Sequence, residues 1–184
     1  SACLVGSEMC IRDSFYASLK SGNYDVYRVR PANRKKFYED FSFVEESIVS
    51  YNNTEKRPLL SPDGTKVAFI KDRGKLYVKD LKTGESYRIG EHNDVLWVSW
   101  SPDSRYIAYS RTELGPREDV YVVRATKGSE PINVSNHPND DYKPMWTNDG
   151  ERLFYASRNY EGDWWIKYVF LKDATSRNRD EYLK

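Results

Sequence analysis

The sequence predicts an all-β fold built from repeated four-stranded antiparallel units, and three observations support this. A short turn motif recurs at nearly constant spacing along the 184 residues. Each copy is flanked by two extended apolar segments, and a third segment rich in aromatic and β-branched residues follows. The fifteen tyrosines and five tryptophans suit such strands, because flat side chains pack well on a pleated, half-buried surface.

The turn motif is Ser-Pro-Asp-Gly at residues 61–64, Ser-Pro-Asp-Ser at 101–104 and a degraded Thr-Asn-Asp-Gly at 147–150. The copies begin 40 residues (61 to 101) and 46 residues (101 to 147) apart, which is the period of a β-propeller blade. Proline fixes φ for a tight turn, aspartate bonds to nearby backbone, and glycine tolerates positive φ. We therefore predict a compact hairpin between the first and second strands of each blade.

The segments around the motif supply the other strands. The second strands are apolar on both faces, as expected where a neighbouring blade covers each face. The fourth strands are short, polar and in one case begin with proline, which suits an exposed edge. The predicted first strands are 57–60, 96–100 and 143–146; the second, 67–70, 106–109 and 153–156; the third, 76–78, 120–123 and 164–169; the fourth, 86–89 and 131–134.

The sequence thus predicts a β-propeller fragment of about three blades plus part of another. Residues 24–29 and 36–39 match the third and fourth strands of an earlier blade, and 41–49 are predicted to connect it to the next. The charged tail is predicted to be a helix or linker. The predicted boundaries are 15–57 for the partial blade and connection, 58–97, 98–142 and 143–171 for the blades, and 172–184 for the tail.

The first fourteen residues are set apart from this pattern. Residues 3–14 resemble the translation of a transposase adapter used in sequencing libraries, and show neither period nor cap. We therefore exclude residues 1–14 from the fold prediction and expect the chain to be a fragment of a longer gene product. Because Cys3 and Cys10 both lie in this segment, the remainder has no cysteine for a disulfide, a metal site or a nucleophile.

Composition and motifs exclude several functions. A net charge of +1 argues against nucleic acid as the main partner, and no apolar run approaches the roughly 18 residues of a membrane span. The sequence contains no Gly-x-Ser-x-Gly elbow, His-Glu-x-x-His motif, phosphate-binding loop or dinucleotide fingerprint. We predict no catalytic residue, no cofactor and no metal site in this chain.

The two histidines occupy equivalent connections, nine and ten residues before a turn motif. Recurrence at a repeat position favours a structural role in the loop. Such loops also surround the channel mouth of a propeller, where partners commonly bind. The acidic cluster at residues 139–141 lacks the ligand spacing of a calcium loop, so we interpret it as a solvated turn. The predicted binding rim therefore comprises His92, Asn93, Asp94, His137, Asp140, Asp141 and Tyr142.

The best copy of the repeat, residues 98–110, followed by Asp-Val-Tyr-Val-Val at 119–123, resembles the WD-like propeller repeats of TolB and of tricorn-like proteases. Residues 136–141, 144–146 and 163–166 look most like the tricorn-like branch. The resemblance covers about residues 24–171. It departs from the pattern at Leu60, where an aromatic residue is usual, and at Thr147-Asn148 in place of Ser-Pro.

This resemblance implies a six- or seven-bladed parent and three alternative functions. The first is a non-catalytic propeller region of a tricorn-like serine peptidase, gating or guiding peptides toward a downstream peptidase domain. The second is a TolB-like periplasmic scaffold that binds other proteins. The third is the propeller lid of a prolyl-oligopeptidase-type hydrolase. The implied partners are peptides or proteins. The implied location is periplasmic or extracytoplasmic, with a cytoplasmic one left open.

Overall fold

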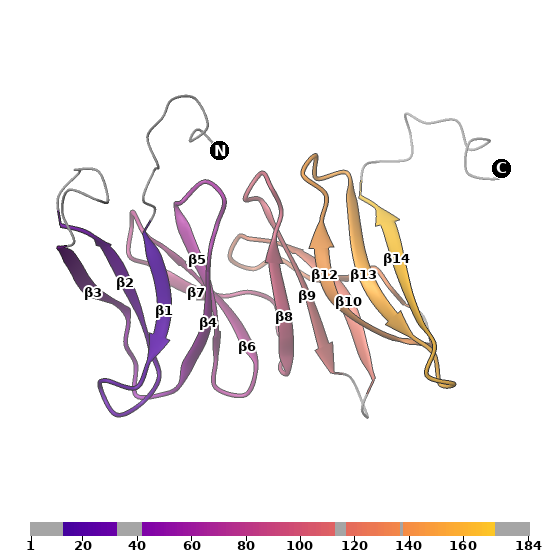
Figure 1. The fold of residues 1–184 in the computed structure, drawn as a ribbon, viewed down its shortest axis with the longest axis horizontal. Helices are drawn as coiled ribbons and strands as arrows, with labels where there is room; N and C mark the ends of the chain where they lie inside the picture. The colour runs from indigo at the N-terminus through magenta and orange to yellow at the C-terminus, as the bar shows by residue number, and fades with distance from the viewer. Residues whose placement is uncertain (1–12, 33–41, 113–116, 137, 172–184) are drawn as a thin grey trace.

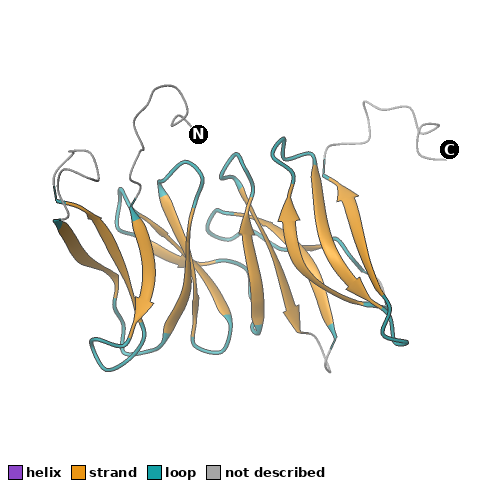
Figure 2. Ribbon diagram, viewed as in Figure 1, coloured by secondary structure: helices purple, strands orange, loops and turns teal. Residues whose placement is uncertain are grey.

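The computed structural model describes residues 13–32, 42–112, 117–136 and 138–171, and within these ranges the regular structure is entirely strand (Figure 2). Four antiparallel sheets follow one another along the chain (Figure 1). In chain order their strands are β1 (Ser14–Ser18), β2 (Asp25–Pro31) and β3 (Phe43–Val49); β4 (Glu55–Leu60), β5 (Lys66–Lys71), β6 (Lys75–Asp80) and β7 (Ser86–Arg88); β8 (Val95–Trp100), β9 (Tyr106–Thr112), β10 (Glu118–Arg124) and β11 (Ile132–Asn133); and β12 (Asp140–Trp146), β13 (Arg152–Arg158) and β14 (Trp164–Phe170).

This arrangement confirms the propeller fold. Each sheet packs face to face on the next, and successive sheets lie side by side in an open arc (Figure 1). None of the described secondary structure is a helix with the length and apolarity of a membrane span.

The hydrophobic core lies between the sheets. Three clusters of buried side chains fill the three junctions, around Phe69, Ile107 and Leu153 respectively. The middle strands β5 and β9 are buried along both faces, whereas β13 alternates between buried and more exposed residues. The difference follows from position, because β13 belongs to the last of the described sheets, and among the described residues only one face of this sheet meets a neighbouring sheet.

The recurring turn closes in the same way in all three copies. The hydroxyl of Ser61 donates to Asp63 Oδ1 at 2.6 Å and accepts from the backbone N–H of Lys66 at 2.9 Å. Ser101 repeats both bonds, and Thr147 repeats them in the degraded copy. The hydroxyl and the aspartate therefore carry the turn, and proline is dispensable.

Ser104 shows how one turn also joins two blades. It holds the glycine position of the motif with φ of 60°, where Gly64 has 74° and Gly150 has 69°. Its side-chain hydroxyl accepts the backbone N–H of Asp63 in the preceding blade at 3.0 Å. The left-handed backbone conformation is unfavourable for serine, and the hydrogen bond across the junction offsets this cost.

Tryptophans on the first strands make a second contact between blades. The indole N–H of Trp100 donates to the carbonyl of Leu59, and that of Trp146 donates to the carbonyl of Ser99, at 3.0 and 3.2 Å. Both acceptors lie on the first strand of the preceding blade. Leu60 holds the equivalent position in the first copy, and a leucine has no N–H with which to repeat this bond.

The predictions for the first sheet need correction, and several others lie outside the described residues. Residues 43–49, expected as a connection, form the edge strand β3, which pairs antiparallel with β2 from Pro31↔Phe43 to Val26↔Val49. The partly charged sequence Phe-Val-Glu-Glu-Ser is a weak strand pattern, and backbone pairing with β2 nevertheless makes it a strand. The strand β1 was not predicted. The predicted fourth strand at 36–39, the predicted tail helix and residues 1–12 lie outside the described residues.

Two substitutions of Ser104 test the contribution of this turn to stability. Ser104→Ala keeps a side chain at positive φ but removes the acceptor for Asp63, so we expect a loss of about 1–2 kcal/mol in the free energy of unfolding. Ser104→Gly removes the same bond and also relieves the backbone, so we expect a smaller loss. Urea denaturation of the three proteins measures both effects. An alanine variant as stable as the parent would contradict the assigned hydrogen bond.

Candidate functional site

The inner strands of the blades each carry an irregularity at the same place. The pairing register shifts between Lys56 and Leu59 in β4, between Val95 and Val98 in β8, and between Tyr142 and Met145 in β12. Two of these bulges contain proline, which lacks an N–H and is tolerated at bulges and edges. In a propeller the first strand of each blade borders the central channel. The bulges therefore place irregular backbone on the channel side of three successive blades.

Arg57, Trp97 and Lys143 occupy one equivalent position in these bulges, four residues before each turn motif. Arg57 and Lys143 have φ of 54° and 55°, which turns their side chains out of the regular strand alternation. The Arg57 guanidinium carbon lies 5.6 Å from the centroid of the Trp97 ring, and the Lys143 ammonium nitrogen lies 4.9 Å from it. We call these three residues the inner-strand row.

The inner-strand row presents two cations and an aromatic face to solvent. Arg57 and Lys143 are exposed, and Trp97 is 43% exposed despite being a large apolar side chain. Arg57 is held in place because its Nη1 donates to the carbonyl of Leu96 at 2.5 Å. Such a row matches a ligand that carries a carboxylate next to an apolar or extended backbone segment.

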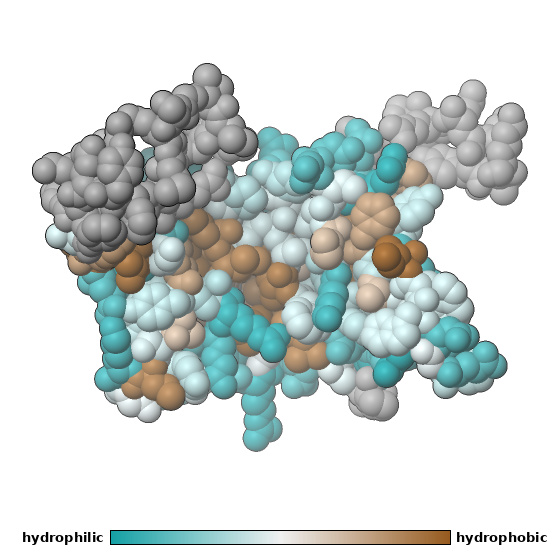
Figure 3. Space-filling view, viewed as in Figure 1, coloured by the Kyte–Doolittle hydropathy of each residue, from teal (hydrophilic) through white to brown (hydrophobic). Residues whose placement is uncertain are grey.

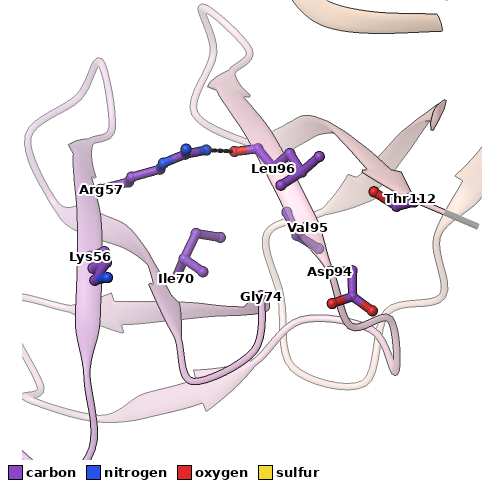
Figure 4. A pocket seen from close by; sticks show the side chains of 8 residues that line it. All are labelled: Lys56, Arg57, Ile70, Gly74, Asp94, Val95, Leu96 and Thr112. Carbon is purple, nitrogen blue, oxygen red and sulfur yellow. Dashed lines mark hydrogen bonds between the residues drawn. The ribbon is translucent and has the colours of Figure 1, made fainter. Parts of the chain in front are cut away.

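A cavity of about 390 Å³ lies beside the row, between β4–β5 and β8. Figure 4 shows Arg57 reaching across its mouth from β4 to Leu96 on β8. The lining combines apolar and charged side chains, as small-molecule and peptide sites commonly do. It consists of Lys56, Arg57, Ile70, Gly74, Asp94, Val95, Leu96 and Thr112.

Part of the predicted binding rim borders this region. The exposed residues Asn93 and Asp94 line a second, polar cavity of about 530 Å³ together with Asp72, Arg73 and other residues of the neighbouring blade. Asp94 borders both cavities. The strands β8 and β12 begin at the lower edge of the view in Figure 1, where the space-filling view shows many polar side chains below an apolar middle (Figure 3).

His92 points away from this rim. Its Nδ1 lies 2.8 Å from the hydroxyl of Tyr109, and its ring packs edge-on against Tyr121 with centroids 4.6 Å apart. Both tyrosines belong to the buried cluster between the second and third sheets, and burial raises the pKa of Tyr109. This placement agrees with the structural role that the repeat position favours. His137, the other predicted histidine, lies outside the described residues.

The remaining rim residues are engaged within the last junction. Asp140 accepts a hydrogen bond from Arg158 at 2.7 Å and another from the backbone N–H of Glu118 at 2.9 Å. Asp141 is fully buried. Tyr142 packs edge-on against Trp164 of β14 with centroids 5.2 Å apart, and burial is the main cause that raises its pKa. The structure thus leaves Asn93 and Asp94 as the exposed part of the rim.

Sequence reasoning missed the inner-strand row. Arg57 and Lys143 both precede a proline at the same distance from the turn motif, and Trp97 stands at that distance in the middle copy. This recurrence was visible in the sequence. Trp100 and Trp146 contact the preceding blade, whereas the bulge in β8 leaves Trp97 43% exposed.

Comparison with known proteins finds similar sequences among proteins named as peptidases. No family model matches the chain. The chain is 28% identical over 136 residues to the uncharacterized peptidase YuxL of Bacillus subtilis, covering 68% of this chain and 20% of that protein. It is 27% identical over 109 residues to tricorn protease homolog 1 of Streptomyces coelicolor, covering 55% and 10%. The chain therefore spans about a fifth and a tenth of the lengths of these curated relatives.

Solved structures show the same fold at low sequence identity. TolB from Acinetobacter baumannii matches 85% of this chain and 38% of its own with a TM-score of 0.62 at 16% identity. The tricorn protease matches 85% and 16% with a TM-score of 0.61 at 15% identity. A prolyl endopeptidase matches 88% and 27% with a TM-score of 0.60 at 15% identity. The chain therefore has the β-propeller fold of these proteins, as its repeats predicted.

Gly74 holds the wall of the cavity close to the next blade, which a substitution can test. Its φ is 82°, and a Cβ atom there would lie 2.5 Å from the Cα of Asp94. We expect Gly74→Ala to lower the free energy of unfolding by at least about 2 kcal/mol, because backbone must move. Gly84→Ala is the matched control, since its φ is 78° with no atom within 4 Å of the added Cβ.

Urea denaturation of the two variants separates crowding from backbone strain. We expect Gly84→Ala to lose roughly 1 kcal/mol from positive φ alone. Equal losses in the two variants would show that the close approach of Gly74 to the next blade contributes nothing.

Proposed function

We propose that this chain is a non-catalytic propeller region of a larger tricorn-like serine peptidase, in which it guides peptide substrates toward the peptidase domain. The observation that carries this proposal is the inner-strand row beside a cavity on the channel side of the blades. Support also comes from the two curated relatives, which are named as a peptidase and a tricorn protease homolog. The propeller lid of a prolyl-oligopeptidase-type hydrolase is the closely related alternative, favoured by the likeness to a prolyl endopeptidase fold.

The chemistry of the row suggests which part of a peptide it contacts. Arg57 and Lys143 supply positive charge close to the Trp97 ring, and the Trp97 side chain is 43% exposed. A carboxylate can accept hydrogen bonds from the guanidinium or the ammonium group, and charge-assisted bonds of this kind are the stronger ones. We propose that the row binds acidic side chains or the terminal carboxylate of an extended peptide.

A TolB-like scaffold that binds proteins is the second candidate, because the TolB fold matches this chain as well as the tricorn fold does. We propose a periplasmic or extracytoplasmic location with either candidate. The two candidates differ in what the parent gene encodes beyond Lys184. Amplification and sequencing outward from both ends of the coding region distinguishes them. A peptidase domain supports the first proposal, whereas an open frame that ends after a few more blades supports the scaffold.

Peptide binding tests the proposed role of the row directly. Fluorescence anisotropy with a labelled acidic hexapeptide, compared with the same peptide carrying amide side chains and an amidated end, measures the preference for carboxylates. We expect the chain to prefer the acidic peptide, and Arg57→Gln combined with Lys143→Gln to raise its Kd about tenfold or more.

The matched control is Lys82→Gln, which removes an exposed cation from the outer β6–β7 turn. It is expected to leave both affinities unchanged. An acidic peptide that binds equally to the parent and to the double variant would contradict the assignment of the row.

A further inference from the structure

Two carboxyl groups are buried together at the junction between the first and second sheets. Asp25 begins β2, Glu55 begins β4, and both residues have no exposed surface. The Oδ2 atom of Asp25 accepts hydrogen bonds from the hydroxyls of Ser21 and Ser50. Among the described residues, Asp25 Oδ1 and both carboxyl oxygens of Glu55 have no hydrogen-bond partner of normal geometry. Buried polar atoms of this kind usually have partners.

One bound proton would supply the missing hydrogen-bond donor for these carboxyl oxygens. Two ionised carboxylates only accept hydrogen bonds and repel each other, so they cannot satisfy one another. Once one of them is protonated, it becomes a donor, and a hydrogen bond between the two side chains satisfies an oxygen on each. The pair then carries a single negative charge, which the low-dielectric junction tolerates better than two.

Lys71 is the neighbouring cation that acts on Glu55. Lys71 stands opposite Glu55 in the β4–β5 ladder, with its ammonium 3.8 Å from the centroid of the Tyr51 ring. On β1, the Tyr16 hydroxyl donates its hydrogen bond to Glu45 and not to the buried pair. Lys56 follows Glu55 on β4 and lies over the Tyr24 ring.

Burial outweighs the effect of Lys71 at Glu55. Burial, with Asp25 adding in the same direction, raises the pKa of Glu55 to about 7, although Lys71 and the backbone amide of Tyr51 lower it. This direction means that the folded junction holds its proton more tightly than the unfolded chain does.

We propose that the junction between the sheets β1–β3 and β4–β7 binds one proton, held by Glu55 in a hydrogen bond to Asp25, and that release of this proton loosens the junction. The proton leaves the shared hydrogen bond for solvent, and two buried negative charges remain face to face. The stabilisation is present below the ordinary carboxyl range near pH 4.5 and is lost as the pH rises through about 7.

The repeat provides a second acidic pair and a junction without one. Asp119 and Asp141 hold the positions of Asp25 and Glu55 in the last junction, by their places before the third-strand Val-Tyr and before the turn motif. Both are buried. The middle junction has Lys75 and Val95 at these positions. A carboxyl pair is therefore a feature of alternate junctions in this chain.

Hydrogen exchange reports each junction separately. The backbone N–H of Glu55 donates to the carbonyl of Tyr24 across the first junction at 2.7 Å. The N–H of Val95 donates to the carbonyl of Gly74 across the middle junction at 2.9 Å, in the same geometry. Both amides belong to one molecule, so the ratio of their protection factors removes the intrinsic effect of pH on exchange.

The experiment measures this ratio by NMR from about pH 5 to about pH 8. We expect protection of the Glu55 amide to fall about tenfold to a hundredfold relative to that of Val95 across this range, given a pKa near 7 against 4.5. A ratio that stays constant would overturn the proposal.

Glu55→Gln is the decisive variant, because its amide donates to Asp25 at every pH. Its ratio is expected to be independent of pH. This result would also show that His92, which packs at the middle junction, does not change the exchange of the reference amide of Val95. Glu161→Gln, at an exposed loop position, is the matched control and keeps the parental behaviour. Retention of the pH dependence in Glu55→Gln would refute the assignment. If that variant does not fold, the carboxyl ¹³C shift of Glu55 in the parent chain is followed instead; a midpoint near 7 supports the proposal and one below about 5 refutes it.

Discussion

Burial between neighbouring sheets is the interaction on which this structure depends. Each sheet is only three or four strands wide, and its apolar side chains are covered by the next sheet along the chain rather than by a layer of its own. Several hydrogen bonds also link the sheets at these junctions. The indole bonds of Trp100 and Trp146, the hydroxyl of Ser104 and the backbone bonds of Glu55 and Val95 all fix one sheet relative to the next. Stability therefore arises from contacts between nearest neighbours.

The sequence predicted the repeat well because local chemistry and tertiary packing agree there. The Ser/Thr-x-Asp pattern closes a hairpin on its own, and the strands around it are apolar for the same reason in each copy. The first sheet was predicted less well. Its edge strand β3 contains charged residues and depends on pairing with β2, which no local pattern encodes. A match to the turn motif was likewise absent there, since the sheet begins among the described residues with a second-strand equivalent, β1.

The candidate site was harder to predict because a bulge decides which way a side chain points. Trp97 and Trp100 are three residues apart on one strand, yet Trp97 is 43% exposed and Trp100 is buried. Regular alternation would put them on opposite faces of the sheet but would not expose either one to the channel. The predicted binding rim likewise grouped residues that the structure divides. His92 packs into the core, whereas Asn93 and Asp94 line an exposed cavity. Local irregularities of the inner strands thus decide which side chains form the candidate surface, and the regular part of each blade supports it.

The absence of strand exchange between the described sheets gives the arc a definite response to mechanical force. A pull on the two ends of the described part acts on all junctions in series, and each sheet can separate from its neighbour without breaking the ladder of any other sheet. Extension would therefore proceed in steps of one sheet, ordered by the strength of the junctions. The junction around Phe69, with the smallest buried cluster, would open before the one around Ile107, which contains the largest.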